Sequence, residues 1–294
     1  MQHRDPAADR DRARSDGAAH QRRAAGQPAM SEAGSREADQ PDPFADWNWE
    51  DPAGLNQVMD EFTASLATAH TLERVASAPY SAAQLATLGI TGIEFAAFRT
   101  THSAGLGADL VGLRAPGAST EPGHIYRVDS ECYFTQLDIA EPLPVADAAL
   151  DWVYAEHLIE HVSLPTAVHW LTEVRRVLAP GGVLRLTTPD LAKYVAGYLD
   201  GDPFFAKHRR RVGQAIRVAP AMPARKAFMF NQLFYLYGHR WLYDLAELRH
   251  VLGEAGFAAS EVRLCGYRSG SRDDIAELDQ KFRSDETIYL EVSP

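Results

Sequence analysis

The sequence predicts an α/β fold with a doubly wound, mostly parallel sheet of seven strands, the last of them antiparallel. From about residue 92, short apolar segments of strand type alternate with amphipathic helical segments, which is typical of parallel sheets flanked by helices. One helical segment stops at Pro180-Gly181-Gly182 and leads directly into an apolar strand. The 294 residues, 46% of them hydrophobic, suffice for one large core rather than two domains.

Each expected element follows from its local pattern. The apolar residues of 55–76 recur at helical spacing, and so do those of 165–178. A third helix is expected over 242–255, where Gly256 ends it. The seven strands are expected at 92–95, 108–113, 133–139, 150–155, 183–188, 261–265 and 287–292.

The N-terminal part of the chain differs in composition from the rest. Residues 1–45 contain almost no large apolar side chains, so ordering them would bury too little surface to offset the lost entropy. We expect a disordered tail over 1–45 and a single domain over 46–294. Between the fifth strand and the last helix, an insertion at about 195–241 interrupts that domain.

Charge and cysteine usage exclude several classes of protein. The formal net charge of −11 argues against broad, nonspecific nucleic-acid binding. Cys132 and Cys265 stand far apart, which indicates a reducing compartment and neither a disulfide framework nor a cysteine metal site. No apolar run approaches the roughly 18 residues of a membrane span. We therefore expect a cytoplasmic protein without a membrane or nucleic-acid partner, and the oligomeric state stays open.

Acidic residues mark the expected ligand edge of the sheet. Ligands of open parallel sheets bind outside the carboxyl ends of the strands. We place Asp109, Asp138 and Glu156 at three such ends. Carboxylates there can accept hydrogen bonds from the hydroxyl and amino groups of a nucleoside.

The order of motifs in the second half resembles the class I S-adenosylmethionine-dependent methyltransferases. Asp138-Ile139 follows one strand, Glu156-His157 ends the next, and the helix that breaks at Pro180 feeds a third. The resemblance implies a Rossmann-like methyltransferase fold and S-adenosyl-L-methionine as cofactor. It implies that Asp109 accepts hydrogen bonds from the ribose hydroxyls and that Asp138 accepts one from the adenine amino group. It also implies that Glu156 lies beside the methionine portion of the cofactor. The cofactor-binding residues expected in this way are Ala96, Ala97, Phe98, Asp109, Leu110, Asp138, Ile139 and Glu156.

The first loop departs from the family pattern. The family has a Gly-X-Gly turn after its first strand, whereas this chain has Ala96-Ala97-Phe98, thirteen residues before Asp109 in the same frame. Glycines serve there because the backbone must approach the ligand closely and adopt positive φ. The Phe98 side chain must either swing out of the pocket or occupy part of the methionine or ribose site.

Residues 157–161 also spell H-x-x-E-H, a pattern of inverted zinc peptidases. That chemistry needs both histidines on one face of a helix. Here the segment directly follows a strand, and Pro165 comes four residues after His161, so no long helix is available. We expect no metal, with Glu160 and His161 supporting the loop.

The insertion contains a basic stretch, whereas the chain as a whole is acidic. Residues 207–226 contain seven Lys or Arg and no acid, and aromatic residues flank them. A basic lid with aromatic walls would suit an anionic, partly apolar small molecule. The alternative is a solvated helix face over an aromatic core. Substrate contacts are expected from Arg217, Asn231, Arg240 and Tyr243, and a general base from His157 or His239.

These observations together favour an S-adenosylmethionine-dependent methyltransferase that acts on a small molecule. Two alternatives stay open. One is a methyltransferase-like binding or regulatory subunit that has lost or altered cofactor use, which the Ala96-Ala97-Phe98 turn favours. The other is a different enzyme on this scaffold, such as a cyclase, a lyase or a zinc hydrolase.

Overall fold

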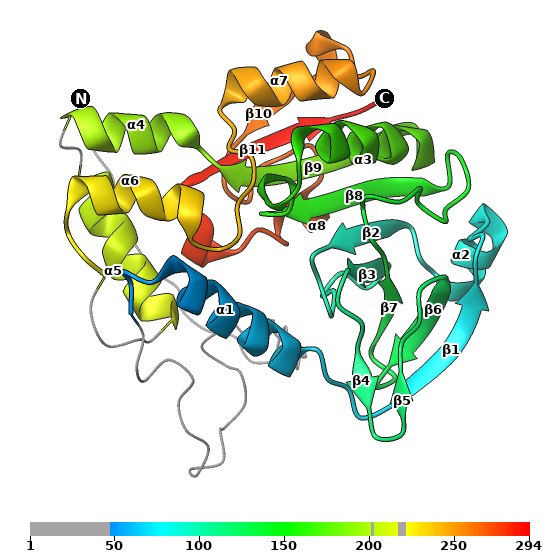
Figure 1. Cartoon of the computed structure of the whole chain (residues 1–294). Helices are drawn as coiled ribbons and strands as arrows, with labels where there is room; N and C mark the ends of the chain where they lie inside the picture. Colours follow the sequence, from blue (N-terminus) through cyan, green and yellow to red (C-terminus); the bar gives the residue numbers. More distant parts are fainter. Residues whose placement is uncertain (1–47, 201–202, 217–221) are drawn as a thin grey trace, which may run out of the picture.

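The computed structural model describes residues 48–200, 203–216 and 222–294. The expected disordered tail over 1–45 lies outside these residues. A central sheet runs through the described part, with helices packed along it and a separate helical group at one end (Figure 1). No helix in these ranges combines the length and apolar character needed to cross a lipid bilayer.

The sheet confirms the expected α/β class. Strands β7, β3, β2, β8 and β9 are parallel neighbours, and the last strand, β11, pairs antiparallel with β9. In spatial order the strands are β1 (Leu72–Ser77), β6 (His124–Val128), β7 (Cys132–Gln136), β3 (Gly105–Asp109), β2 (Gly92–Phe95), β8 (Leu150–Glu156), β9 (Leu178–Pro189), β11 (Thr287–Val292) and β10 (Arg263–Cys265).

The described sheet has nine strands rather than the seven expected, because β1 and β6 extend it beyond β7 with antiparallel pairing. Strand β1 takes residues that we assigned to the end of the first helix. That helix, α1, spans Pro52–Leu66 and ends early, since the following residues pair with β6 and form the bridge between Thr68 and Arg114. The second expected strand, 108–113, was also misplaced. The structure has β3 at Gly105–Asp109, with its two glycines inside the strand.

One face of the sheet carries helices. Helices α3 (Leu164–Val177) and α7 (Leu245–Glu254) lie along it, and α2 (Ala82–Leu88) packs near the β1 edge (Figure 1). Trp170, Leu171 and Val174 of α3 are fully buried in the main core, as the amphipathic pattern predicts.

The opposite face is covered by the segment between β10 and β11, which contains the short helix α8 (Asp273–Ala276). Ile275 and Leu278 pack on the Trp152 and Tyr154 side chains of β8. The buried Arg185 guanidinium of β9 holds the segment, since its Nε and Nη2 donate to Asp279 at 2.8 and 2.5 Å. Its Nη1 donates to Glu291 Oε1 at 3.0 Å.

The connection between β2 and β3 is unusually short. Nine residues, 96–104, join these parallel strands without a helix. A Cβ on Gly105 would lie 2.6 Å from Thr100 Oγ1, and one on Gly107 would lie 2.8 Å from the Ala97 carbonyl oxygen. The glycines of β3 therefore let the connection lie directly against the sheet.

The expected insertion forms helices α4 (Leu191–Asp200), α5 (Phe204–Ile216) and α6 (Lys226–Tyr235). They pack with α1 around a second hydrophobic cluster, beyond the ends of β8 and β9 (Figure 1). Trp49 joins this cluster and meets the Phe228 ring edge-on, with centroids 6.5 Å apart. The hairpin β4 (Arg114–Ala115) and β5 (Ala118–Ser119) follows β3.

We predict that Gly107→Ala lowers the free energy of unfolding by about 1–3 kcal/mol, because its Cβ would collide with a backbone oxygen of the connection. Gly253→Ala is the matched control. This glycine lies in α7 with nothing within 4 Å of an added Cβ, so the change should stabilise by about 0.5–1 kcal/mol. Urea unfolding measures both, and a Gly107→Ala protein as stable as the parent contradicts the packing of the connection.

Candidate functional site

The turn after β2 adopts the conformation that the family's glycines would supply. Ala96 has φ of 55°, in the left-handed region, and is exposed. Ala97 N–H donates to the Ala108 carbonyl at 3.1 Å, which joins the turn to β3. Left-handed backbone costs an alanine roughly 1–2 kcal/mol. The turn therefore forms without glycine, at an energetic cost.

The Phe98 side chain packs away from the turn. Its ring lies 6.5 Å from that of Phe134, centroid to centroid, against an apolar cluster that includes Leu113 and Val128. Of the two expected placements, out of the pocket or inside the methionine or ribose site, this packing on Phe134 corresponds to the first.

Asp109 and Asp138 have the same local geometry. Asp109 Oδ1 accepts from the Val111 N–H at 2.8 Å, and Asp138 Oδ1 accepts from the Ala140 N–H at 2.9 Å. Each carboxylate is thus held by the backbone two residues on, as in an Asx-turn. Burial raises the pKa of Asp109 to about 6, against the effect of its backbone hydrogen bonds.

Their neighbours in sequence lie differently. The Leu110 side chain is 63% exposed beside Asp109, so it is available to cover a ligand. Ile139 is buried in the main core and supports the loop from below, which leaves its backbone for contact.

Two buried carboxyl groups, those of Glu94 and Glu156, belong to the carboxyl-terminal parts of β2 and β8. Glu156 Oε1 accepts from the Gln280 N–H at 3.0 Å, while its Oε2 is buried without a partner among the described residues. Glu94 of β2, which the sequence analysis missed, also has a buried Oε2 without a described partner. Burial raises both pKa values, that of Glu94 to about 7, and Glu156 adds to the effect on Glu94. An acid inside the buried strand Gly92–Phe95 was the available signal.

His157 has an oxygen atom close to each of its ring nitrogens. Thr287 donates its hydroxyl proton to the Arg283 carbonyl, so its oxygen accepts from His157 Nε2 at 2.8 Å. His157 Nδ1 lies 3.2 Å from Glu160 Oε1. The backbone of His157 has φ of 52°, which turns the chain out of β8. Both ring nitrogens of His157 therefore lie near oxygen atoms of other side chains.

Glu160, His161 and His239 lie together beyond β8. Glu160 is fully buried, and the facing imidazoles of His157, His161 and His239 overcome its desolvation and hold its pKa at about 2. Burial lowers the pKa of His161 to about 4 and also lowers that of His239. The two rings meet edge-to-face, with centroids 4.9 Å apart. Residues Ile159–His161 form a single 3-10 turn, so the H-x-x-E-H segment lies on no long helix, in line with the sequence analysis.

The expected substrate residues do not come together. Arg217 lies outside the described residues. Asn231 is exposed in an apolar groove of about 350 Å³ between α4 and α6. Arg240 has an exposed side chain, and its N–H donates to the Glu160 carbonyl at 2.7 Å. Tyr243, from which a substrate contact was expected, is fully buried in the main core, so its side chain has no exposed surface in this structure.

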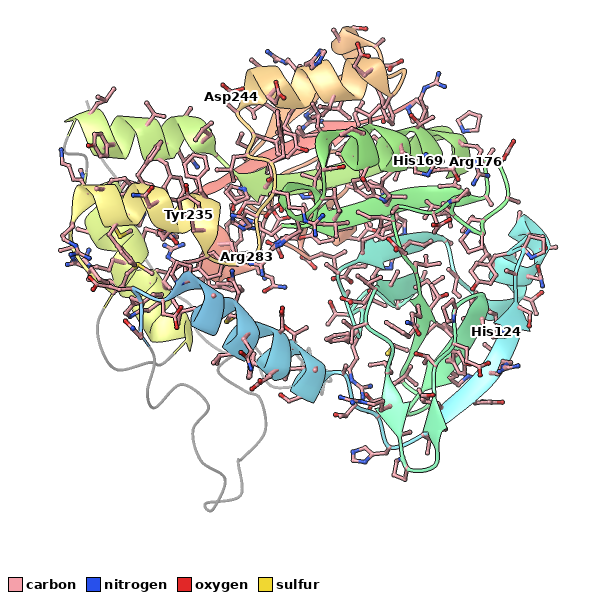
Figure 2. The ribbon with its side chains drawn as sticks, in the orientation of Figure 1. His124, His169, Arg176, Tyr235, Asp244 and Arg283 are labelled. Carbon is pink, nitrogen blue, oxygen red and sulfur yellow. The ribbon has the colours of Figure 1, made fainter. Side chains whose placement is uncertain are left out.

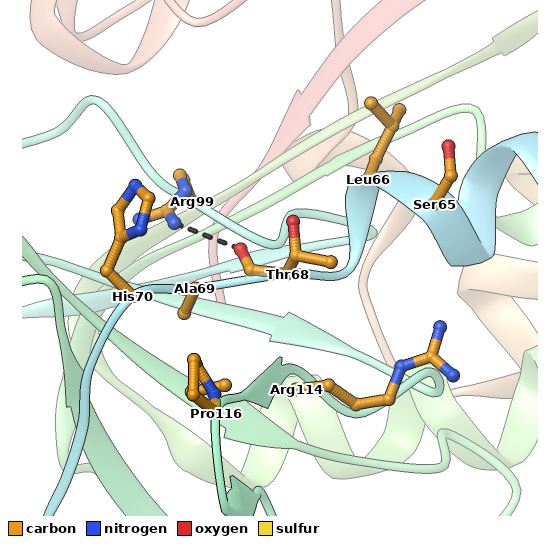
Figure 3. Close-up of a pocket in the computed structure, with 9 residues that line it drawn as sticks. Ser65, Leu66, Thr68, Ala69, His70, Arg99, Arg114 and Pro116 are labelled. Atoms are coloured by element: carbon orange, nitrogen blue, oxygen red, sulfur yellow. Dashed lines mark hydrogen bonds between the residues drawn. The ribbon is translucent and has the colours of Figure 1, made fainter. Parts of the chain in front are cut away.

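A basic pocket of about 600 Å³ opens beside the turn (Figure 3). The end of α1, the 96–104 connection and β4 line it, and its lining includes the guanidinium groups of Arg99 and Arg114 and the imidazole of His70. Arg99 donates to the Thr68 carbonyl at 3.1 Å and to Asp129 Oδ2 at 2.6 Å. The lining of this pocket comes from three separate segments, so no local sequence pattern indicates it.

Many cations of the insertion bind protein groups. Arg211 Nη1 donates to the Lys281 carbonyl at 2.9 Å, Lys226 donates to the Tyr198 carbonyl at 2.8 Å, and Arg225 pairs with Glu50. Arg283, in the segment between β10 and β11, lies between the insertion and the sheet (Figure 2).

Comparisons with solved structures find likenesses at low identity. PigF with SAH is 11% identical, with 69% of this chain and 56% of that chain covered and a TM-score of 0.38. The chain thus spans little more than half the length of PigF. An S-adenosylmethionine-dependent methyltransferase from Mesorhizobium loti is 16% identical, with 71% and 95% covered and a TM-score of 0.39. A SAM-dependent methyltransferase from Archaeoglobus fulgidus is 11% identical, with 72% and 92% covered and a TM-score of 0.38.

No curated protein matches the chain. A family model described as "Methyltransferase domain" matches residues 9–262, which is most of the sequence. The match includes every strand of the sheet except β10 and β11. The chain therefore belongs to the methyltransferase domain family.

Proposed function

We propose that the chain transfers the methyl group of S-adenosyl-L-methionine to a small-molecule acceptor. One observation carries the proposal. Asp109, Asp138 and Glu156 stand at the carboxyl ends of β3, β7 and β8, on both sides of the turn at the end of β2. This edge of a parallel sheet is where such folds bind their ligands.

The residues present fit a cationic nucleoside. Each Asx-turn uses Oδ1 of Asp109 or Asp138, which leaves Oδ2 to accept from ribose hydroxyls or the adenine amino group. The Oε2 atoms of Glu94 and Glu156 are buried and have no hydrogen-bond partner among the described residues, and the pKa values of both carboxyl groups are raised. A positive sulfonium or ammonium group beside them would favour their ionised forms.

The bound cofactor supplies an electrophilic methyl group on its sulfonium. The chain has to hold the nucleoside, align the acceptor and exclude water. The insertion and α1, packed together beyond the strand ends, would form the wall that excludes water.

His239 is the better candidate for a general base. Its Nδ1–H donates to the Leu233 carbonyl at 2.7 Å, so Nε2 of the neutral ring keeps a lone pair. The lowered pKa keeps the ring neutral near pH 7. His157 has no such free nitrogen, and we assign it the task of orienting Glu160.

An anionic acceptor is favoured by the basic pocket beside the turn, which Arg99 and Arg114 line. The Ala96-Ala97-Phe98 turn was the support for a chain that has lost its cofactor. The packing of Phe98 on Phe134 weakens that alternative, because the side chain need not fill the cofactor site. A cytoplasmic location and the absence of a nucleic-acid partner stay predictions from the sequence.

Asp109→Ala and Asp138→Ala should each weaken cofactor binding about ten- to hundredfold, since hydrogen bonds to charged groups contribute roughly 1.5–3 kcal/mol. Calorimetric titration with S-adenosyl-L-methionine measures the loss. Asp151→Ala is the control, because Asp151 is exposed near the start of β8, at the opposite end of the strand. Equal affinities for all three variants and the parent would refute the assignment of these two acids.

Phe98→Gly should lose stability, by about 1–3 kcal/mol, without any gain in cofactor affinity, because the ring packs on Phe134. Phe98→Leu, which keeps an apolar contact, should lose less. Thermal unfolding and cofactor titration on the same samples check both expectations. Tighter cofactor binding by Phe98→Gly would instead mean that the ring closes the pocket.

Glu94→Gln should stabilise the cofactor-free protein at pH 8. The folded-state pKa of about 7 lies above the ordinary value of 4.5, so folding takes up a proton between these values. The contribution of the Glu94 carboxyl group to the free energy of unfolding is fully present below pH 4.5 and is lost as the pH rises through 7. The raised pKa converts to a gain of up to about 3 kcal/mol for the variant at pH 8, against little at pH 4.5. Urea unfolding of the variant and the parent at the two pH values measures this gain. A difference in the free energy of unfolding that is the same at both pH values would contradict the raised pKa of Glu94.

A further inference from the structure

Three side chains with metal-binding chemistry converge beside the proposed methyl-transfer site. One ligand atom each from Glu160, His161 and His239 lies within 4.8 Å of the other two. Glu160 and His161 come from the short turn after β8, and His239 comes from the segment after α6. The trio differs from the H-x-x-E-H pattern, because His239 replaces His157.

Each member of the trio has an atom available for a cation. His239 donates from Nδ1 to the Leu233 carbonyl, an outer contact that orients the ring and leaves the Nε2 lone pair. Neither ring nitrogen of His161 has a hydrogen bond in the described part of the chain. Glu160 Oε1 is buried and lacks hydrogen-bond geometry to any described donor, although His157 Nδ1 is 3.2 Å away.

The surroundings also suit a bound ion. Thr188 donates its hydroxyl proton to Glu160 Oε2 at 3.0 Å, so the carboxylate is anchored on the side away from Oε1. The Tyr243 hydroxyl is fully buried, has no partner among the described residues and feels the charge of Glu160. A buried carboxylate, two imidazoles and an unsatisfied hydroxyl thus gather in one place.

We propose that Glu160, His161 and His239 bind one divalent transition-metal ion, of which Zn²⁺ is the best match. Two imidazoles and one carboxylate are a donor set for Zn²⁺ that leaves a coordination position open. Ligand atoms about 2.0–2.1 Å from a tetrahedral ion are roughly 3.4 Å apart, so the trio must close by about 1.4 Å at most. The His161 ring can make this movement, because no hydrogen bond holds it.

The ion would add to the proposed function without depending on it. An acceptor oxygen bound at an open coordination position of the ion would lose its proton more readily. In that state His239 acts as a ligand, and the ion takes over the activation of the acceptor. The role rests on the proposed methyl transfer, whereas the binding of the ion does not.

The test uses the full-length chain, purified without a histidine tag and stripped with a chelator. Titration with Zn²⁺ should show one equivalent bound, and Co²⁺ should give the intense visible absorption of a low-coordinate site. His161→Ala and His239→Ala should each weaken binding more than tenfold, and Thr188→Val should weaken it about 10-fold, as outer-contact changes do. His250→Ala is the matched control, because this histidine is exposed on α7.

Several results would overturn the site. Absence of stoichiometric Zn²⁺ binding by the parent protein does so, whatever the variants do. Binding that survives both His161→Ala and His239→Ala, in samples that circular dichroism shows to be folded, also does so. Cofactor titration on the same samples separates the two proposals. A protein that binds S-adenosyl-L-methionine but no metal keeps the methyltransferase function and loses only the ion.

Discussion

The short connection between β2 and β3 constrains the rest of the structure. Residues 96–104 lie directly on the sheet, where Gly105 and Gly107 leave no room for a Cβ. This placement forces Ala96 into the left-handed region and sends Phe98 toward Phe134. With no helix over this part of the sheet, the segment between β10 and β11 covers the neighbouring strands, held there by the buried Arg185.

Burial separates the acids of the site into two kinds. At Glu94 and Glu156 desolvation outweighs the groups that offset it, so their pKa values rise. Glu160 is equally buried, yet the imidazoles around it keep it ionised. The first pair suits a cation that arrives with the cofactor, whereas Glu160 already has the imidazole rings of three histidines as neighbours. Residues of one chemical type thus have different tasks because their environments differ.

Local patterns predicted the elements that local forces determine. The strand at Gly92–Phe95, the last strand at Thr287–Val292 and the amphipathic α3 were expected within a residue or so of their bounds. The sequence did not predict β1, because the residues after α1 become a strand only by pairing with β6. Likewise, Thr287 binds His157 from 130 residues away, and His239 meets Glu160 only after the insertion folds back. Such pairings leave no periodic signal in a single sequence.

The central claim is that the carboxyl edge around β2 binds the cofactor although the turn lacks glycine. A crystal structure of the chain with S-adenosylhomocysteine tests it most directly. The account predicts ribose hydroxyls on Asp109, the adenine ring beside Asp138 and Ile139, and the Phe98 ring still packed against Phe134. A nucleoside bound elsewhere, or bound only after Phe98 has left that cluster, would contradict it.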